Sequence, residues 1–290
     1  MMEIIRSPQE MQAWSRAKAR SGVTVGLVPT MGFFHEGHLS LMRMAATLCD
    51  SVVVSHFVNP TQFGPNEDLD RYPRDFERDM DLVRKEPVTA VFAPTPDLMY
   101  PEGFQTEVRV QQLATYLCGR SRPIHFAGVA TVVSKLFNIV LPEVAVFGEK
   151  DFQQLAIIRR LVADMNIPVR IVGHPIVREA DGLAMSSRNA NLNPANRAAA
   201  LSLSTALQLA RTQAAQGQRS TTELAVLLER HIHSFAGTAI DYANFVDCET
   251  LEPVEMVDER TVLALAVFVE GKAGKVRLID NGFVLPRQEG

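Results

Sequence analysis

Short apolar runs alternate with amphipathic segments along the first two thirds of the chain. Five runs have the length and β-branched content of buried strands: residues 23–28, 51–58, 91–93, 144–147 and 169–172. Three segments between them repeat apolar residues every three or four positions, as a helix packed on one face does: residues 39–49, 128–140 and 155–165. Residues 74–85 are expected to form a charged helix. This alternation predicts an α/β fold with a doubly wound, Rossmann-like parallel sheet.

The pattern changes beyond a turn-rich bridge at residues 181–189. Alanine- and leucine-rich helices are predicted at 194–216 and 221–235, and three strands follow near 241–246, 262–269 and 276–279. We therefore expect a boundary near Met185, with residues 1–184 forming the larger domain. Residues 185–290 are expected to form a smaller α+β domain that closes over the active site. Residues 94–122 are rich in turn signals, with an edge strand expected at 107–110.

One stretch, residues 28–41, joins the first long strand to an amphipathic helix through a glycine-bearing turn. Pro29 is expected to close the strand, because proline cannot donate to a ladder. The turn should present free backbone N–H groups and the positive end of a helix dipole, which together suit a phosphate. His35 and His38 fall where that phosphate would arrive.

Three other interpretations of this stretch compete with a phosphate site. The spacing from Gly32 to Gly37 is that of a P-loop, but His38-Leu39 replaces the required Lys-Ser/Thr. A zinc-protease motif needs histidines four apart on a helix, whereas His35 and His38 are three apart around a glycine. A purely structural turn explains the glycines but leaves two histidines at a helix start unexplained.

Other polar segments follow predicted strands, at the edge where ligands bind in open α/β sheets. Gln62 lies in the loop after residues 51–58, and Gln154 lies after the Gly148-Glu149-Lys150-Asp151 turn. A glutamine amide both donates and accepts, so two of them can hold a small hydroxy acid without adding charge. Met185-Ser186-Ser187-Arg188 supplies hydroxyls and a guanidinium that can stabilise charge on leaving pyrophosphate.

Composition narrows the class of protein. Of the 290 residues 47% are hydrophobic and 21% are charged, and the net charge of -4 creates no basic field for nucleic acid or an anionic membrane. The three cysteines have no CxxC spacing, and no apolar run is long enough to span a bilayer. We expect a cytoplasmic protein. Asp79 and Asp81 are interpreted as solvated helix charges, and no metal ligand is assigned.

Several motifs together resemble one family. Pro-Thr-Met-Gly followed by His-x-Gly-His resembles the signature of pantothenate synthetase (pantoate–β-alanine ligase), within the wider group that carries the HIGH motif. Phe-Val-Asn-Pro-x-Gln-Phe, Arg-Pro-x-His-Phe-x-Gly-Val, Phe-Gly-Glu-Lys-Asp-x-Gln-Gln, Ala-Met-Ser-Ser-Arg-Asn and Leu-Ile-Asp-Asn follow in family order. The departures are few, and they affect the packing around the pocket: Phe33-Phe34, His56, Ile124, Cys118-Gly119-Arg120 and His174.

The resemblance implies ATP-dependent condensation of (R)-pantoate with β-alanine through a pantoyl adenylate, with Mg²⁺ accompanying ATP and a homodimeric assembly. It implies catalytic roles for His38, His35 and Lys150, and pantoate or β-alanine contacts from Gln62 and Gln154. It implies ATP contacts from a longer set: Met31, Gly32, His35, Gly37, His38, Gly148, Glu149, Lys150, Asp151, Val177, Met185, Ser186, Ser187 and Arg188. No nucleic acid or membrane partner is implied.

Two other functions stay open from the sequence. Another nucleotidylyltransferase would keep the nucleotide in its product instead of releasing AMP. A non-catalytic nucleotide-binding module is the second alternative. Adenosine recognition alone would not require the combination of His35, His38, Lys150 and Arg188.

Overall fold

The computed structural model describes residues 2–65, 67–272 and 274–286, and it divides into two compact units. The first unit contains the described residues up to Ala114, then Arg122–Glu149 and Gln154–Pro175. The second contains Thr115–Ser121, Lys150–Gln153 and the described residues from Ile176 onward. The last change of unit thus falls between Pro175 and Ile176, upstream of the boundary expected near Met185.

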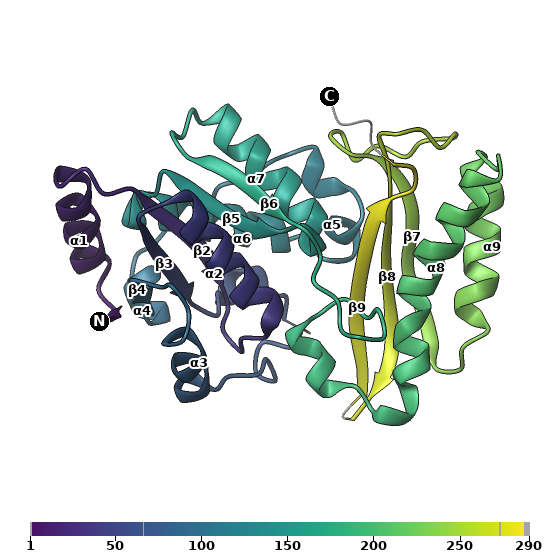
Figure 1. The fold of residues 1–290 in the computed structure, drawn as a ribbon, viewed down its shortest axis with the longest axis horizontal. Coiled ribbons are helices and arrows are strands. Elements are labelled where there is room, and N and C mark those ends of the chain that lie inside the picture. The colour runs from purple at the N-terminus through teal and green to yellow at the C-terminus, as the bar shows by residue number, and fades with distance from the viewer. Residues whose placement is uncertain (1, 66, 273, 287–290) are drawn as a thin grey trace. The chain divides into compact units, whose positions relative to one another are not determined.

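The first unit is built on a six-stranded sheet in which every pairing is parallel (Figure 1). The spatial order is β1-β4-β3-β2-β5-β6. The strands have these bounds: β1 Glu3–Ile5, β2 Val25–Thr30, β3 Ser51–His56, β4 Ala90–Phe92, β5 Val144–Gly148 and β6 Arg170–His174. The predicted doubly wound α/β sheet is confirmed.

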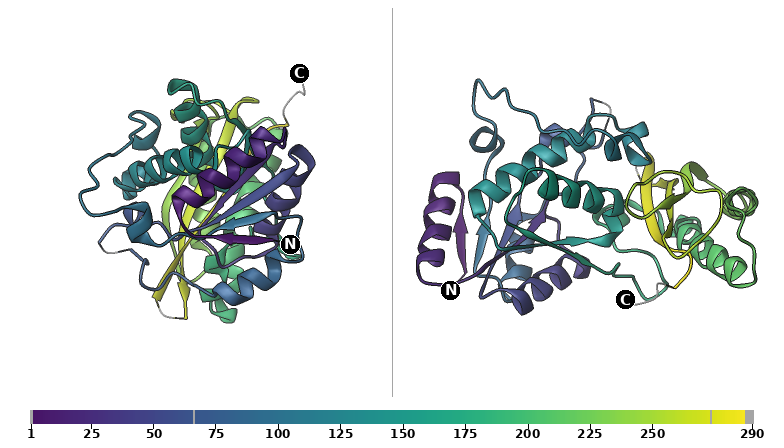
Figure 2. Two further views of the ribbon diagram at one scale, coloured as in Figure 1. Left: turned by 90° about the vertical axis from the view of Figure 1, so that its left-hand side faces the viewer. Right: turned by 90° about the horizontal axis from the view of Figure 1, so that it is seen from above.

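Helices cover both faces of this sheet because successive residues of each strand point to opposite faces (Figure 2). In β2, Leu27 packs in the core that includes α1 (Pro8–Arg20), α6 (His125–Val140) and α7 (Phe152–Asp164). The next residue, Val28, packs in the opposite core with α2 (Glu36–Leu48) and α3 (Phe76–Val83). Because both faces of the sheet are buried, its strands are apolar at nearly every position.

The sheet reverses its winding direction beside β2. The chain runs outward from β2 through β3 to β4, then returns to place β5 on the other side of β2. This reversal is a topological switch point, and ligands of open α/β sheets bind at the carboxyl ends of the strands there. The turn after β2 ends at His35, with His38 in the first turn of α2, and the 3-10 helix Glu149–Asp151 follows β5 directly.

Three local expectations differ from the structure. Pro29 lies inside β2 and pairs with Ser55, because β5 pairs only with Gly26 and Leu27 and requires no N–H from Pro29. Residues 107–110 form no strand; the Val108 N–H instead donates to the Thr131 hydroxyl at 2.9 Å. Helix α6 begins at His125 rather than at residue 128. The segment before it contains two short helices, α4 (Pro96–Met99) and α5 (Cys118–Ser121).

The second unit is an α+β domain, as predicted. Its antiparallel sheet has the order β7-β8-β9, with β7 Thr238–Asp247, β8 Thr261–Gly271 and β9 Gly274–Phe283. Helices α8 (Arg197–Ala215) and α9 (Thr221–His233) pack on it through a shared apolar core. Among the described residues, no helix is both long and apolar enough to cross a bilayer.

Helix α9 provides a test of where the stability of the second unit resides. Leu228 is 0% exposed in the core, whereas Val226, two positions earlier, is 44% exposed. Leu228→Ala is expected to lower the free energy of unfolding by about 2–5 kcal/mol, because it removes buried methyl groups and leaves a cavity. Val226→Ala should change it by less than about 0.5 kcal/mol. Urea unfolding followed by circular dichroism measures both, and equal effects would contradict this assignment of the core.

Candidate active site

The turn between β2 and α2 adopts a backbone that most residues avoid. Gly32 and Phe33 have φ values of 81° and 52°, both in the left-handed region. Glycine adopts this region freely, but a non-glycine residue there costs roughly 1–2 kcal/mol. A side chain at Gly32 is also excluded by space, since a Cβ would lie 2.5 Å from Nε2 of His56. The turn therefore needs both the glycine and an outside partner that stabilises Phe33.

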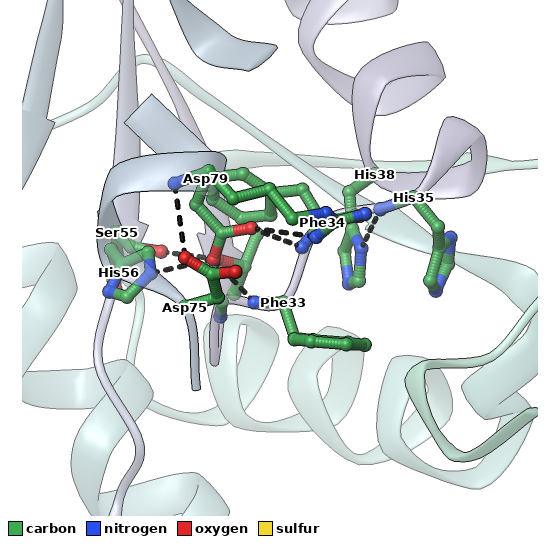
Figure 3. A network of polar contacts seen from close by, with 11 residues as sticks. Phe33, Phe34, His35, His38, Ser55, His56, Asp75 and Asp79 are labelled. Carbon is green, nitrogen blue, oxygen red and sulfur yellow. Dashed lines mark hydrogen bonds and ion pairs between the residues drawn. The ribbon is translucent and has the colours of Figure 1, made fainter. Parts of the chain in front are cut away.

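That partner is the carboxylate of Asp79 on α3 (Figure 3). Its oxygens accept hydrogen bonds from the backbone N–H groups of Phe33 at 2.5 Å and Phe34 at 2.7 Å. His56 Nε2 lies 2.9 Å from the same carboxylate, which is completely buried. The expectation that Asp79 is a solvated helix charge is wrong. Asp79 lies on the apolar face of α3, three positions after Phe76 and next to Met80, and this spacing could have signalled its burial.

His35 and His38 lie side by side at the start of α2, with ring centroids 4.1 Å apart (Figure 3). His35 is the N-cap residue, and its backbone N–H donates to Nδ1 of His38 at 3.4 Å. A ring nitrogen that accepts a hydrogen bond carries no proton, so this contact assigns the neutral His38 ring proton to Nε2. His38 therefore presents an N–H donor from the first turn of a helix, where the dipole favours an anion.

The backbone amides of the turn are less available than the sequence suggested. Gly32 N–H donates to the Thr30 hydroxyl at 3.3 Å, and the next three amides are bonded to Asp79 and His38 as described. Glu36 and Gly37 are the first two residues of α2, and their amides have no acceptor within the described part of the chain. The expectation that the whole turn presents free N–H groups is thus corrected. The helix start supplies those that a phosphate can use.

Gln62 lies close to this turn, although it comes from the loop after β3. Its Oε1 accepts from Asn59 Nδ2 at 3.2 Å, and its Nε2 lies 3.1 Å from the sulfur of Met31. Asn59 is itself held by Gly128 O at 3.2 Å and by the Tyr100 hydroxyl at 2.7 Å. These contacts orient the Gln62 amide with its N–H₂ group towards Met31, where it can donate to a carboxylate or a hydroxyl. The sequence did not reveal Asn59 as the residue that orients it.

Helix α6 approaches the Gln62 loop unusually closely. A Cβ at Gly128 would lie 2.5 Å from Thr61 O and 2.6 Å from the backbone of Gln62. His125, at the start of the same helix, places Nδ1 3.0 Å from Gln62 O and is buried. His125 therefore holds the loop backbone. Arg122 adds a hydrogen bond to Gln62 O at 3.3 Å and an ion pair with Glu67 at 2.5 Å.

The structure distinguishes the two neighbouring glutamines after β5. Gln153 is buried, and both ends of its amide are used, because it accepts from Cys118 N–H at 3.0 Å and donates to Tyr116 O at 2.7 Å. Gln154 is half-buried in the first unit, and its amide has no protein partner in the part of the chain that the structure describes. The choice of Gln154 for substrate contact is compatible with this arrangement.

Lys150 belongs to the second unit, within the 3-10 helix Glu149–Asp151. Its carbonyl accepts a hydrogen bond from Asn281 Nδ2 at 2.8 Å. Asn281 N–H in turn donates to Asp280 at 2.8 Å, and the buried Asp280 carboxylate pairs with both terminal nitrogens of Arg178. The hydrogen bond to Asp280 raises the pKa of Arg178. The Ile-Asp-Asn motif near the end of the chain therefore holds the backbone of Lys150.

The Ser-Ser-Arg segment follows a short antiparallel bridge in the second unit. Met185 N–H donates to Val177 O at 3.0 Å, and Arg178 and Ala184 form the β-bridge. Ser186 caps the 3-10 helix Ser187–Asn191 by accepting from the Arg188 N–H at 3.3 Å. Met185, Ser186 and Arg188 are half-buried, and Ser187 is buried.

The predicted site residues thus divide between the units. The first unit gathers part of the set around the carboxyl ends of its central strands: Met31, Gly32, His35, Gly37, His38, Gln62, Gly148, Glu149 and Gln154. The second unit contains the others: Lys150, Asp151, Val177, Met185, Ser186, Ser187 and Arg188.

A doubly wound sheet with a His-x-Gly-His turn at its switch point defines the class of nucleotide-binding domains with a HIGH motif. The comparisons with known proteins narrow this class. The model of the family described as pantoate-beta-alanine ligase matches residues 3–283. The pantothenate synthetase of Geobacter sulfurreducens is 58% identical over 280 residues, which cover 97% of this chain and 98% of that protein.

Solved structures agree with this match. Pantothenate synthetase from Thermus thermophilus has a TM-score of 0.91 at 43% identity, covering 98% of this chain and 100% of that chain. The ligase from Francisella tularensis, complexed with beta-gamma ATP and beta-alanine, has a TM-score of 0.79 at 32% identity and covers 98% of both chains. The present chain belongs to the pantoate-beta-alanine ligase family.

The close approach at Gly128 yields a prediction for substrate binding. Gly128→Ala should push the loop away from α6, because the new methyl group would meet backbone atoms that no side-chain rotation can relieve. Steady-state kinetics should show a roughly tenfold rise in KM for pantoate, since a displaced Gln62 would lose the pantoate contact that the sequence predicts for it. The KM for ATP should change much less. Equal changes in both constants would contradict a specific link between α6 and the Gln62 loop.

Proposed function

We propose that this protein joins pantoate to β-alanine with consumption of ATP, giving pantothenate, AMP and pyrophosphate. Family membership over residues 3–283 supports the reaction, as does the relative from Francisella tularensis that was solved with beta-gamma ATP and beta-alanine. One observation carries the proposal to the residues of this chain. The His38 N–H donor at the start of α2 belongs to the same unit as the oriented amide of Gln62, which contacts Met31 in the turn before that helix.

The first half-reaction forms the adenylate. A carboxylate oxygen of pantoate attacks the α-phosphorus of ATP, the bond to the bridging oxygen breaks, and pyrophosphate leaves. Two anions must be brought together while negative charge grows on the leaving group, so positioning and fixed donors carry most of the catalysis. His38 donates from Nε2 to phosphate oxygens, and His35 and Lys150 hold the phosphates.

The second half-reaction uses the mixed anhydride. The neutral amine of β-alanine attacks the pantoyl carbonyl, the bond to the AMP oxygen breaks, and the nitrogen releases one proton. Gln62 and Gln154 hold pantoate through their amides in both halves. The remaining proposed ATP contacts come from both units: Met31, Gly32, Gly37, Gly148 and Glu149 in the first, and Asp151, Val177, Met185, Ser186, Ser187 and Arg188 in the second.

Mg²⁺ belongs to the proposal as the partner of ATP. Within the described ranges, no three His, Cys, Asp or Glu side chains are grouped as metal ligands. Mg²⁺ is commonly held by substrate phosphates with few protein carboxylates, so this set of residues fits a metal that enters bound to ATP. The homodimer and the cytoplasmic location expected from the sequence stay predictions.

The product spectrum tests the proposed reaction. Wild-type protein incubated with ATP, Mg²⁺, pantoate and β-alanine should yield AMP and pantothenate together, and chromatography should find neither when pantoate is omitted. ADP with phosphate would mean attack at the γ-phosphorus and would refute the adenylate mechanism. A stable nucleotidylated product that persists with β-alanine would instead indicate another nucleotidylyltransferase.

His38→Ala tests the donor at the start of α2. An interaction that is stronger in the transition state lowers kcat, and loss of one such donor costs about 10²–10³ in rate, or roughly 3–4 kcal/mol. Single-turnover kinetics should show this loss in adenylate formation. Supplied with pre-made pantoyl adenylate and β-alanine, the variant should lose much less, because no pyrophosphate leaves in that half.

The matched control is His233→Ala, which removes an exposed histidine from α9. It should leave both half-reactions unchanged. If His38→Ala slowed both halves equally, His38 would have a general role in shaping the pocket, and its assignment as a phosphate donor would be withdrawn.

A further inference from the structure

Helix α3 contacts the turn after β2 through polar side chains as well as through apolar packing. Asp79 accepts from two successive backbone amides of the turn, and Arg78 donates from Nη2 to Phe34 O at 3.0 Å. The Arg78 guanidinium also lies 5.0 Å from the centre of the Phe33 ring. Two neighbouring side chains of one helix thus hold both the amides and the carbonyl of the same short segment.

The residues just before His35 are therefore held from outside the turn. Two successive amides that point to one anion form a concave anion site, and here a carboxylate of the protein occupies it. An exogenous phosphate is excluded from that position. The turn continues directly into His35, whose N–H orients the His38 ring, so the position of Phe34 is transmitted to both histidines.

His56 completes the environment of Asp79 from the opposite side. Its Nε2 lies 2.9 Å from Oδ2 of Asp79. Its ring meets the rings of Phe34 and Phe76 edge-on, with centroid-to-centroid distances of 5.5 and 5.2 Å. The ionised carboxylate can only accept, so His56 Nε2 is the donor. A buried carboxylate is costly unless it is hydrogen-bonded on all sides, and His56 supplies a bond that an aliphatic residue cannot.

We propose that Asp79 is a positioning residue for adenylate formation, which sets the orientation of His38 through the backbone of Phe33 and Phe34, and that His56 keeps the Asp79 carboxylate in place. This role rests on the proposed function, because the oriented group is the phosphate donor of that reaction. Asp79 itself need not touch the substrate. The unusual Phe33-Phe34 and His56 of this sequence then belong to one device that fixes the His-x-Gly-His turn.

The experiment compares Asp79→Asn with Asp81→Asn. Asp81 lies on the same helix, its side chain is 71% exposed, and among the described residues its ion pair is with Arg84, so it is a matched control. Asparagine at position 79 can accept from one amide, but its N–H₂ group opposes the other. We measure pyrophosphate release in a single turnover with ATP, Mg²⁺ and pantoate. The rate constant should fall roughly 10²-fold in Asp79→Asn, as displaced catalytic groups do, with an unchanged amplitude.

A second readout does not depend on activity. In protein labelled with ¹⁵N-histidine, the His38 signal should show a single neutral Nε2–H form, and subtraction of the His38→Ala spectrum identifies it among the seven histidines. Asp79→Asn should shift this signal towards a mixture of tautomers, while Asp81→Asn should not. An unshifted His38 signal together with an unchanged rate constant would overturn the proposal.

Two further variants cover the case in which Asp79→Asn fails to fold. His56→Gln keeps an N–H donor for Asp79, whereas His56→Leu removes it at similar size, so adenylate formation should be faster in His56→Gln than in His56→Leu. Equal rate constants, or losses confined to the amplitude, would mean that these residues only support folding. If wild type and Asp81→Asn release no pyrophosphate, the proposed function fails, and the histidine spectra still decide the positioning role.

Discussion

The turn between β2 and α2 depends on an internal carboxylate. Gly32 and Phe33 both have backbone angles in the left-handed region. For phenylalanine this conformation costs conformational free energy, because its Cβ comes too close to the backbone. Asp79 offsets this cost by accepting from two successive amides at a fully buried position. The anchored segment leads directly into His35 and His38, and His56 contacts the same carboxylate (Figure 3).

A second constraint is the close packing of backbone on backbone. Gly128 allows α6 to lie directly against the loop that contains Asn59 and Gln62, and there is no room for a Cβ. The loop is consequently held by main-chain contacts and by the amide of Asn59, so the orientation of Gln62 is set before substrate arrives. Such pre-organisation would lower the entropic cost of the pantoate contact that we propose for Gln62.

In the second unit, buried polar contacts likewise hold the backbone of a predicted site residue, Lys150. Asp280 and Arg178 form a paired, largely buried ion pair, and Asn281 next to Asp280 holds the carbonyl of Lys150. A buried pair of this kind is weak evidence for stability but gives a defined position to the residues attached to it. Lys150 and residues 280–281, which are far apart in the sequence, therefore belong to one local arrangement of the second unit.

The sequence by itself determined the parallel sheet, the helices on its two faces, the α+β unit and the family. Periodicity reports which faces are buried, and short motifs such as His-x-Gly-His carry local geometry in their own residues. The bounds of β2 and the lack of a strand at residues 107–110 depended on which neighbours each strand acquired. Only the tertiary structure decided the role of Asp79, the orientation of Gln62 by Asn59, and the use of the Gln153 amide in contacts with the protein backbone. Asp79 and Gln153 contact residues dozens of positions away, and Asn59, which is only three residues before Gln62, is itself held by the distant Tyr100 and Gly128. The burial of a charge is decided by such distant partners rather than by its neighbours in the chain.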